Sequence, residues 1–117
     1  HYIGKSAVVE NSSISEGCEI EGNVDYSVIS SNVTIEAGAD VRYSVVMPGA
    51  HIQKGAKVYY SIVAENAVIQ ADAKVGEIPE QLQNPAGWGI AVIGAGATVT
   101  GKRDIAPGEM IKSGEEV

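Results

Sequence analysis

The chain has 117 residues, enough for one domain, and it carries eight Lys and Arg against fifteen Asp and Glu, for a formal net charge of −7. This acidic balance, with no basic cluster larger than Lys102-Arg103, makes nucleic acid and anionic membrane surfaces poor partners. One cysteine excludes an internal disulfide framework, and no segment resembles a signal peptide or a membrane span. We therefore expect a cytoplasmic protein with no nucleic-acid and no membrane partner.

The chain enters a repeat at once. Ile3 to Asn11 matches part of one turn, and residues 12–26 form a turn that is two residues short. Three segments of 17 residues then follow without a gap: Ser27 to Tyr43 (SVISSNVTIEAGADVRY), Ser44 to Tyr60 (SVVMPGAHIQKGAKVYY) and Ser61 to Glu77 (SIVAENAVIQADAKVGE). Within these segments, large aliphatic residues recur at spacings of six: Ile29, Ile35, Val41; Val46, Ile52, Val58; Val63, Ile69, Val75.

A strict period of six predicts short strands joined by corners. Six residues turn a helix by about 600°, so the apolar face of a helix would drift away from its partner. Three six-residue sides instead close a triangle, and a small inward residue follows each large one four positions later. These small residues are Cys18, Val33, Ala50 and Ala67 on one side, and Ala7, Ala39, Ala56, Ala73 and Ala97 on the next. The pattern is typical of the all-β hexapeptide-repeat parallel β-helix, with five to six turns in a triangular prism.

The regular coils are expected over residues 3–75 of a single domain, 1–117. Residues 76–90 (GEIPEQLQNPAGWGI) interrupt the period with two prolines and the only Trp, which predicts a loop projecting from one corner. The period resumes at Ile93, Val99, Ile105 and Ile111, so residues 91–112 form the final coils. We expect the tail, 113–117, to fray.

Stacking in register should align residues 17 apart on the outside of the coil. Tyr26, Tyr43 and Tyr60 then form one column, Ser27, Ser44 and Ser61 a second, and Asp25, Arg42 and Tyr59 a third. The tyrosine column fits two interpretations: stacking on a solvated face, or a contact face in which Tyr26, Tyr43, Tyr60 and Trp88 form an interface. The Asp25 and Arg42 side chains, on adjacent turns, are expected to form only a surface ion pair.

Catalytic and metal-binding motifs are sparse. His1 and His51 are too few for the three-His zinc sites of some β-helices. His51 fits the general base of an acyltransferase, but we expect no neighbouring Asp or Glu to fix its tautomer. Cys18 occupies a small inward position and is expected to be a core residue. The sequence has no P-loop and no GxGxxG motif, so we expect no catalytic, cofactor-binding or metal site within the chain.

A more specific likeness covers nearly the whole chain. The segment Asn11 to Ile52 (NSSISEGCEIEGNVDYSVISSNVTIEAGADVRYSVVMPGAHI) resembles the start of the C-terminal β-helix of bacterial ADP-glucose pyrophosphorylases, the glucose-1-phosphate adenylyltransferases of glycogen synthesis. The most telling pieces are Ser15 to Val24, SVVMPGA at Ser44 to Ala50, and Trp88 to Gly94. The resemblance implies a left-handed coil, and Ile3-Gly4 matches the entry to that domain.

The resemblance also implies what the rest of the protein does. A catalytic N-terminal domain, absent from this fragment, would bind ATP and convert ATP and glucose 1-phosphate to ADP-glucose and pyrophosphate with Mg²⁺. The β-helix would pack on that domain, help to build a homo- or hetero-tetramer, and contribute to allosteric regulation by an anionic sugar-phosphate or nucleotide effector. The abrupt start of the coil at Ile3 fits this expectation, because it leaves a strand edge that another domain should cover.

The effector residues of plant-type relatives do not carry over. The positions that match their lysines are Glu65 and Gly94, which cannot donate a charge to phosphate. On charge alone, the candidate effector contacts are Arg42, Lys54, Lys57, Lys102 and Arg103. Three alternatives remain open: a non-catalytic regulatory sister subunit of the same enzyme, a module of a related sugar nucleotidyltransferase, and a free-standing hexapeptide acyltransferase.

Overall fold

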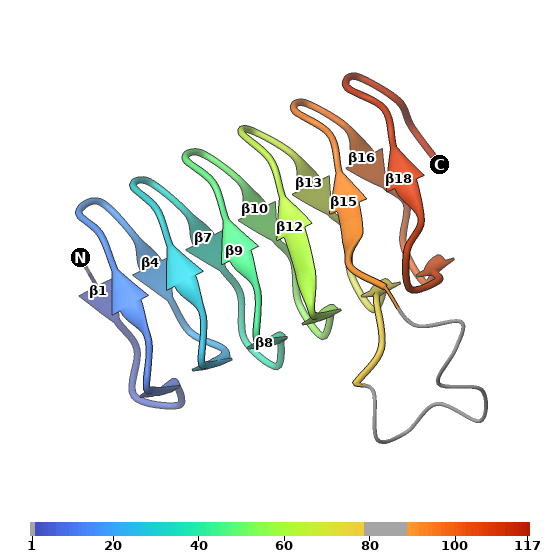
Figure 1. The fold of residues 1–117 in the computed structure, drawn as a ribbon. Coiled ribbons are helices and arrows are strands. Elements are labelled where there is room, and N and C mark those ends of the chain that lie inside the picture. Colours follow the sequence, from blue (N-terminus) through green and yellow to red (C-terminus); the bar gives the residue numbers. More distant parts are fainter. Residues whose placement is uncertain (1, 79–88) are drawn as a thin grey trace.

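The computed structural model describes residues 2–78 and 89–117, and in these residues every regular element is a strand of two or three residues. The strands wind as a continuous coil with three flat sides, and each side is a six-stranded parallel sheet (Figure 1). The arrangement is that of the left-handed parallel β-helix of hexapeptide-repeat proteins, which confirms the fold predicted from the period of six. We call the three sides sheets A, B and C, and one circuit of the coil a turn.

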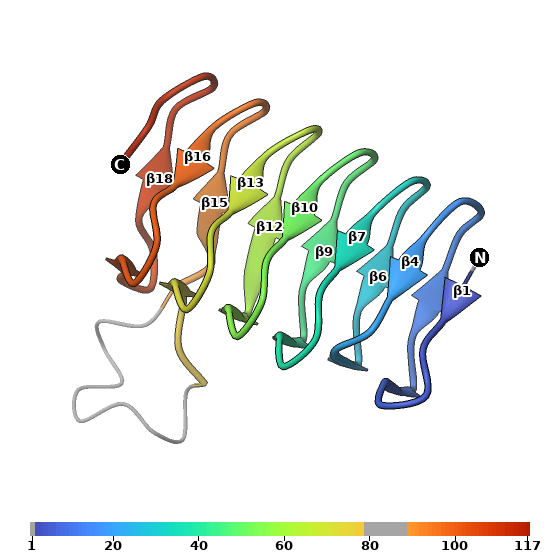
Figure 2. The same cartoon turned by 180° about the vertical axis from the view of Figure 1, so that it is seen from behind.

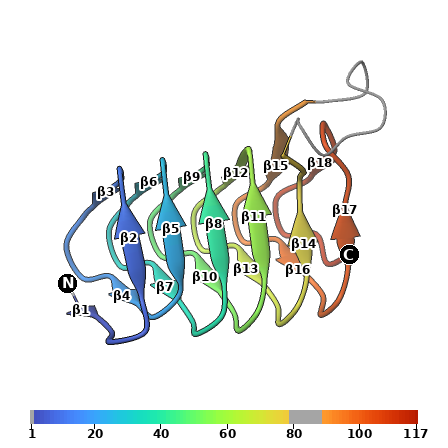
Figure 3. The same ribbon diagram turned by 90° about the horizontal axis from the view of Figure 1, so that it is seen from below.

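The strands alternate strictly between the three sheets. Sheet A contains β1 (Tyr2–Ile3), β4 (Glu19–Ile20), β7 (Thr34–Ile35), β10 (His51–Ile52), β13 (Val68–Ile69) and β16 (Thr98–Val99), which lie in this order along the prism (Figure 2). Sheet B contains β2 (Val8–Glu10), β5 (Asn23–Asp25), β8 (Asp40–Arg42), β11 (Lys57–Tyr59), β14 (Lys74–Val75) and β17 (Asp104–Ile105) (Figure 3). Sheet C contains β3 (Ser13–Ile14), β6 (Val28–Ile29), β9 (Val45–Val46), β12 (Ser61–Val63), β15 (Ala91–Ile93) and β18 (Met110–Ile111).

The pairing register follows the repeat. Neighbouring turns pair residue i with i+17 over most of the coil, as at Val41 and Val58. The predicted short turn pairs i with i+15 instead, because only Glu21 and Gly22 connect β4 to β5. Gly22 is required at this tight corner, since a Cβ there would lie 2.6 Å from the Ala39 carbonyl oxygen.

The core consists of the inward-facing residues of all three sheets. The branched residues six apart are fully buried from Ile20 onward, and Cys18, Val33, Ala50 and Ala67 line one side as predicted. Ala97 is a correction, because it stacks on Ala67 and not on Ala73. The reason is the interruption after Val75, where the register changes to i, i+30 and Arg103 takes the place above Ala73. That shift could not be counted from the period alone.

Corners are built from residues that tolerate a left-handed backbone. The sheet C to sheet A corner places Gly17, Asn32, Gly49 and Asn66 on successive turns, all with positive φ. The two residue types alternate for a steric reason: a Cβ on Gly49 would lie 2.1 Å from Oδ1 of Asn66, which occupies the space above it. Each asparagine side chain thus covers the glycine of the preceding turn.

A column of serines joins the turns at the sheet B to sheet C corner. The Ser44 hydroxyl donates to the Arg42 carbonyl oxygen at 2.8 Å and accepts the Ser61 N–H at 3.2 Å. Ser27 makes the same pair of bonds one turn earlier. The predicted serine column is therefore a buried chain of hydrogen bonds that satisfies corner amides which no strand can pair.

The end of the chain differs from expectation. The tail, 113–117, was expected to fray, but the Val117 N–H donates to the Thr98 carbonyl oxygen at 3.0 Å and Glu116 forms a bridge with Thr98. The Val117 carbonyl oxygen accepts bonds from the Thr100 N–H and hydroxyl, both at 2.7 Å. These bonds continue the pairing of sheet A by one more turn. Of the predicted loop, only residues 76–78 and 89–90 belong to the described part.

Candidate functional surfaces

The outer face of sheet A carries a groove of about 540 Å³. Tyr2, Glu19, Glu21, Thr34, Ile35, Glu36 and His51 line it. Six of these residues stand in two outward columns of the first four turns, Tyr2, Glu19, Thr34 and His51 in one and Glu21 and Glu36 in the other, with the inward Ile35 between the columns. The groove combines three carboxylates, one imidazole and one aromatic ring, which favours a ligand with polar or cationic groups.

His51 has an acidic partner that the sequence did not show. Its Nε2 lies within hydrogen-bonding distance of a Glu36 carboxylate oxygen, and the other oxygen of Glu36 accepts the Lys54 N–H at 3.3 Å. The expectation that no Asp or Glu is near His51 is therefore wrong. Glu36 precedes His51 by fifteen residues and lies diagonally across β7 and β10, so a search among sequence neighbours could not find it. A carboxylate at Nε2 leaves Nδ1 as the second nitrogen for proton transfer.

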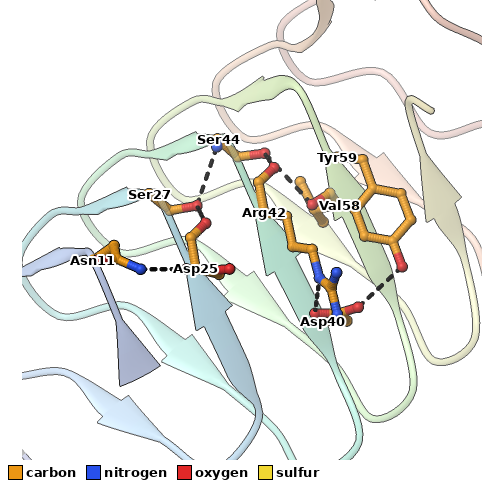
Figure 4. A network of polar contacts seen from close by, with 8 residues as sticks. All are labelled: Asn11, Asp25, Ser27, Asp40, Arg42, Ser44, Val58 and Tyr59. Atoms are coloured by element: carbon orange, nitrogen blue, oxygen red, sulfur yellow. Dashed lines mark hydrogen bonds and ion pairs between the residues drawn. The ribbon is translucent and has the colours of Figure 1, made fainter. Parts of the chain in front are cut away.

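A polar network crosses the outer face of sheet B (Figure 4). Arg42 Nε donates to Asp40 at 3.1 Å, and the Tyr59 hydroxyl donates to the same carboxylate, also at 3.1 Å. Asp25, the expected partner of Arg42, does stand opposite it in register, but its carboxylate accepts a bond from Asn11 at 3.2 Å. The column of Asp25, Arg42 and Tyr59 is confirmed, while the ion pair of Arg42 is made with Asp40.

This network shifts two proton affinities. Burial, and then the Asp40 carboxylate, raise the pKa of Tyr59 to about 12. The bond to Asp40 raises the pKa of the Arg42 guanidinium above its ordinary value. Asp40 thus compensates the charge of Arg42, and Glu10 and Asp25 line the same small hollow. A further anion would meet these carboxylates, so Arg42 is poorly placed as an effector contact.

The other candidate cations gather on one corner. Lys54 and Lys102 lie in the sheet A to sheet B corner, Arg103 follows Lys102, and Lys57 begins β11 on sheet B. Lys74, which the sequence reasoning did not single out, pairs in register with Lys57 and forms an ion pair with Glu77 at 2.6 Å. Lys54 and Lys57 are in one turn and Lys102 and Arg103 are two turns later, with Asp72 in the corner of the turn between them.

The tyrosine column forms as predicted. The rings of Tyr26 and Tyr43 stack with centroids 5.1 Å apart, and those of Tyr43 and Tyr60 with centroids 4.7 Å apart. Ile90 stands on the next turn above Tyr60, because Ser61 pairs with Ala91. The rings remain accessible, with 53% of Tyr26 and 44% of Tyr43 exposed. Trp88, the fourth residue of the expected interface, lies outside the described residues, as does His1.

A second apolar column beside the tyrosines was missed. Its side chains point outward from sheet C, between the buried residues, and each residue pairs with the next across neighbouring strands. The column consists of Val28, Val45, Ile62, Val92 and Met110. The signal was present in the repeat, where two aliphatic residues are adjacent in SVI, SVV, SIV and AVI. The period of six accounts for only the inward member of each pair.

The described residues contain no group of three or more His, Cys, Asp or Glu able to hold a metal ion. Cys18 is buried, as expected of a core residue, and its Sγ lies 2.9 Å from the Ser30 carbonyl oxygen. In the part of the chain that the structure describes, no helix is long and apolar enough to span a membrane.

Comparison with known proteins identifies relatives of the chain. The family described as GlmU-like, C-terminal hexapeptide matches residues 2–86. Glucose-1-phosphate adenylyltransferases of Bacillus anthracis and of Bacillus mycoides (strain KBAB4) are each 53% identical over 38 residues, which is 32% of this chain. The aligned region of the chain spans about one tenth, 10%, of the length of each of these relatives. Among solved structures, a hexapeptide transferase family protein from Anaplasma phagocytophilum aligns over 98% of this chain and 71% of its own, with TM-score 0.50 and 18% identity.

Proposed function

The chain belongs to the GlmU-like, C-terminal hexapeptide family, and we propose that it is the regulatory and oligomerisation module of a glucose-1-phosphate adenylyltransferase. The observation that carries this proposal is the 53% identity to the Bacillus enzymes. The whole protein would then make ADP-glucose and pyrophosphate from ATP and glucose 1-phosphate, for glycogen synthesis. Catalysis would reside outside this chain.

The chemistry of the described residues supports a non-catalytic role. The most acidic groove faces outward from sheet A, and Glu19, Glu21 and Glu36 would repel the phosphates of ATP or glucose 1-phosphate. We therefore assign ATP binding and Mg²⁺ binding to the catalytic domain that the resemblance implies for the whole protein.

The effector contacts of this module would lie on the sheet A to sheet B corner. Lys54 and Lys102 are in that corner, and Lys57 and Arg103 are next to it, whereas Asp40 already compensates Arg42. An anionic sugar phosphate or nucleotide would be held by cations that face its phosphate groups, and this corner carries such cations over three turns.

Steady-state kinetics of the full-length protein test the proposal. We expect release of pyrophosphate from ATP and glucose 1-phosphate, and a change in that rate when glucose 6-phosphate or AMP is added as a probe. Lys57→Glu should weaken the response to the probe at least fivefold and leave the unregulated rate unchanged. Lys5→Glu, a change of the same charge in the first turn, serves as the control. Absence of pyrophosphate release from the full-length protein alone and with its sister subunit would contradict the proposal.

A non-catalytic sister subunit of the same enzyme would differ from a catalytic subunit only outside this chain. Both kinds of subunit would present the same β-helix, so the described residues do not separate them. Mixing the protein with the catalytic subunit decides between them: a silent subunit has no activity alone but changes the response of its partner to the probe.

The pairing of His51 with Glu36 favours acyl transfer as a second candidate. A histidine oriented by a carboxylate beside a groove can accept the proton of a hydroxyl or amine acceptor. In that case acetyl-CoA should bind, and His51→Ala should abolish transfer of the acetyl group to an amino sugar while the fold remains intact. If acetyl-CoA does not bind at millimolar concentration, acyl transfer is excluded and the adenylyltransferase proposal is retained.

A further inference from the structure

The outer face of sheet C is apolar over four consecutive turns. Its three columns read Tyr26, Val28, Ser30; Tyr43, Val45, Met47; Tyr60, Ile62, Ala64; and Ile90, Val92, Gly94. These twelve residues, which we call the sheet C face, include no charged side chain, although one fifth of the chain is charged. Val28 is 50% exposed, Val45 38% and Ile90 51%.

The other two faces are different. Sheet B presents Asp40, Lys57, Lys74 and Asp104 in its main outward column, and sheet A presents Glu19 and His51 with Glu21 and Glu36 beside them. Charged residues also border the sheet C face, with Glu16 and Glu65 along one edge and Asp25 and Arg42 along the other. An uncharged centre with a charged rim is the anatomy of a protein interface.

We propose that the sheet C face binds the sheet C face of a second copy of this chain. The shape of the face is one reason. Its side chains form ridges at the spacing of parallel strands, about 4.8 Å, so ridges of one copy fit the grooves of an identical copy. A two-fold axis near the centre of the face, between Val45 and Ile62, would set the two prisms antiparallel and make the contact isologous.

Charge is the second reason. Each chain carries a net charge of −7, so two copies repel each other unless they meet where the carboxylates are absent. The sheet C face is the outward face of the described coil that satisfies this condition. A strongly basic partner would instead select the acidic groove of sheet A.

The area of the face fits a weak, reversible contact. Three columns spaced about 7 Å apart over four turns of about 4.8 Å cover about 400 Å², and two copies together bury about 800 Å². That total is below the usual size of stable interfaces, so we expect a weak dimer with a dissociation constant in the micromolar range or higher. The contact specifies the assembly part of the proposed function and rests on it, but it is measured without any assay of activity.

Sedimentation velocity of the full-length protein tests the contact. The wild-type protein should associate through this face, and Ile62→Glu, at the centre of the face, should weaken that association at least tenfold. Val68→Glu is the matched control, since Val68 is in the next strand, is similarly half-buried and points outward from sheet A. It should leave the association unchanged.

A mixed sample tests the two-fold arrangement. Ile62→Lys alone should also dissociate, and an equimolar mixture of the Ile62→Glu and Ile62→Lys proteins should reassociate, because the opposite charges meet across the axis. Association that survives Ile62→Glu, a wild-type protein that stays monomeric, or a mixture that stays dissociated would overturn the proposal. If any of these results is found and pyrophosphate is still released, the contact is wrong and the proposed enzymatic function is retained. If the dimer forms as predicted but no pyrophosphate is released, the enzymatic function is wrong and the contact is retained.

Discussion

Sheets B and C are built on the same coil, both with branched aliphatic residues pointing inward, and their outer faces have opposite chemistry. Sheet B carries Asp40 and Arg42 in a hydrogen-bonded network, while sheet C presents Val28 and Val45 at the same spacing. This contrast does not affect the fold, because only the inward side chains pack in the core. The comparison teaches that inward columns specify the β-helix, and outward columns are open to specify partners and ligands.

The largest expected effect comes from breaking an inward column. Ile52 is fully buried in β10 at the middle of the stack. Replacing it with Asp buries a charge without a partner, and we expect a loss on the order of 4 kcal/mol in the free energy of unfolding, with several turns disordered. Thermal melting measures the loss. Lys54→Asp, an outward change two residues later, should shift the free energy by less than about 0.5 kcal/mol. Equal melting curves for the two variants would show that the inward assignment is wrong.

A smaller effect is expected at the corner that separates the two faces. Ser44→Ala removes the acceptor of the buried Ser61 N–H and the donor to the Arg42 carbonyl oxygen. An unsatisfied buried amide costs about 1–3 kcal/mol, which chemical denaturation can resolve. Ser13→Ala, at an exposed position of β3, provides the matched control and should cost nearly nothing. A neutral Ser44→Ala variant would mean that the serine column does not stabilise the stack.

The smallest effect is a dependence on pH at the network of sheet B. The pKa of Tyr59 is raised to about 12 in the folded state, against about 10 in an unfolded chain. The unfolded chain therefore loses this proton first, so the contribution of Tyr59 is fully present below pH 10 and is lost as pH rises toward 12.

Tyr59→Phe isolates this contribution. The variant should lose stability less steeply than the wild type between pH 10 and 12, and ultraviolet titration of the wild type should show one late tyrosine transition that the variant lacks. Tyr26→Phe, on the exposed end of the tyrosine column, is the control. Identical titration curves for wild type and Tyr59→Phe would contradict the assignment.

Most of the fold could be predicted from the sequence because the core has a fixed period. The spacing of Ile35, Val41 and Val46 shows the sides of the triangle, and the missing pair of residues before Tyr26 shows the short turn. Ala97 was assigned to the wrong column because the interruption after Val75 has no period to count. The length of this interruption sets the pairing register of the later turns, and that length is known only once the strands are paired.

The candidate surfaces were less predictable, because they depend on diagonal contacts and on outward positions. Glu36 reaches His51 across two strands of different turns, and no local spacing reveals this. Arg42 was expected to pair with Asp25, yet Asp40, two residues away on the same strand, is the closer acceptor. The column of Val28, Val45 and Ile62 is visible in the sequence as a second aliphatic residue next to each inward one. The period of six accounts only for the inward residue, so it gives no sign of the outward column.

One measurement addresses the contrast between the faces most directly. Val28 on sheet C and Val8 on sheet B are the same residue type, 50% and 49% exposed, and both point outward. Sedimentation of the full-length Val28→Glu and Val8→Glu proteins, with circular dichroism to confirm the fold of each, compares the two faces with everything else held constant. The account predicts that Val28→Glu dissociates the protein and Val8→Glu does not. Equal association of the two variants would contradict the claim that the outer face of sheet C is a binding surface.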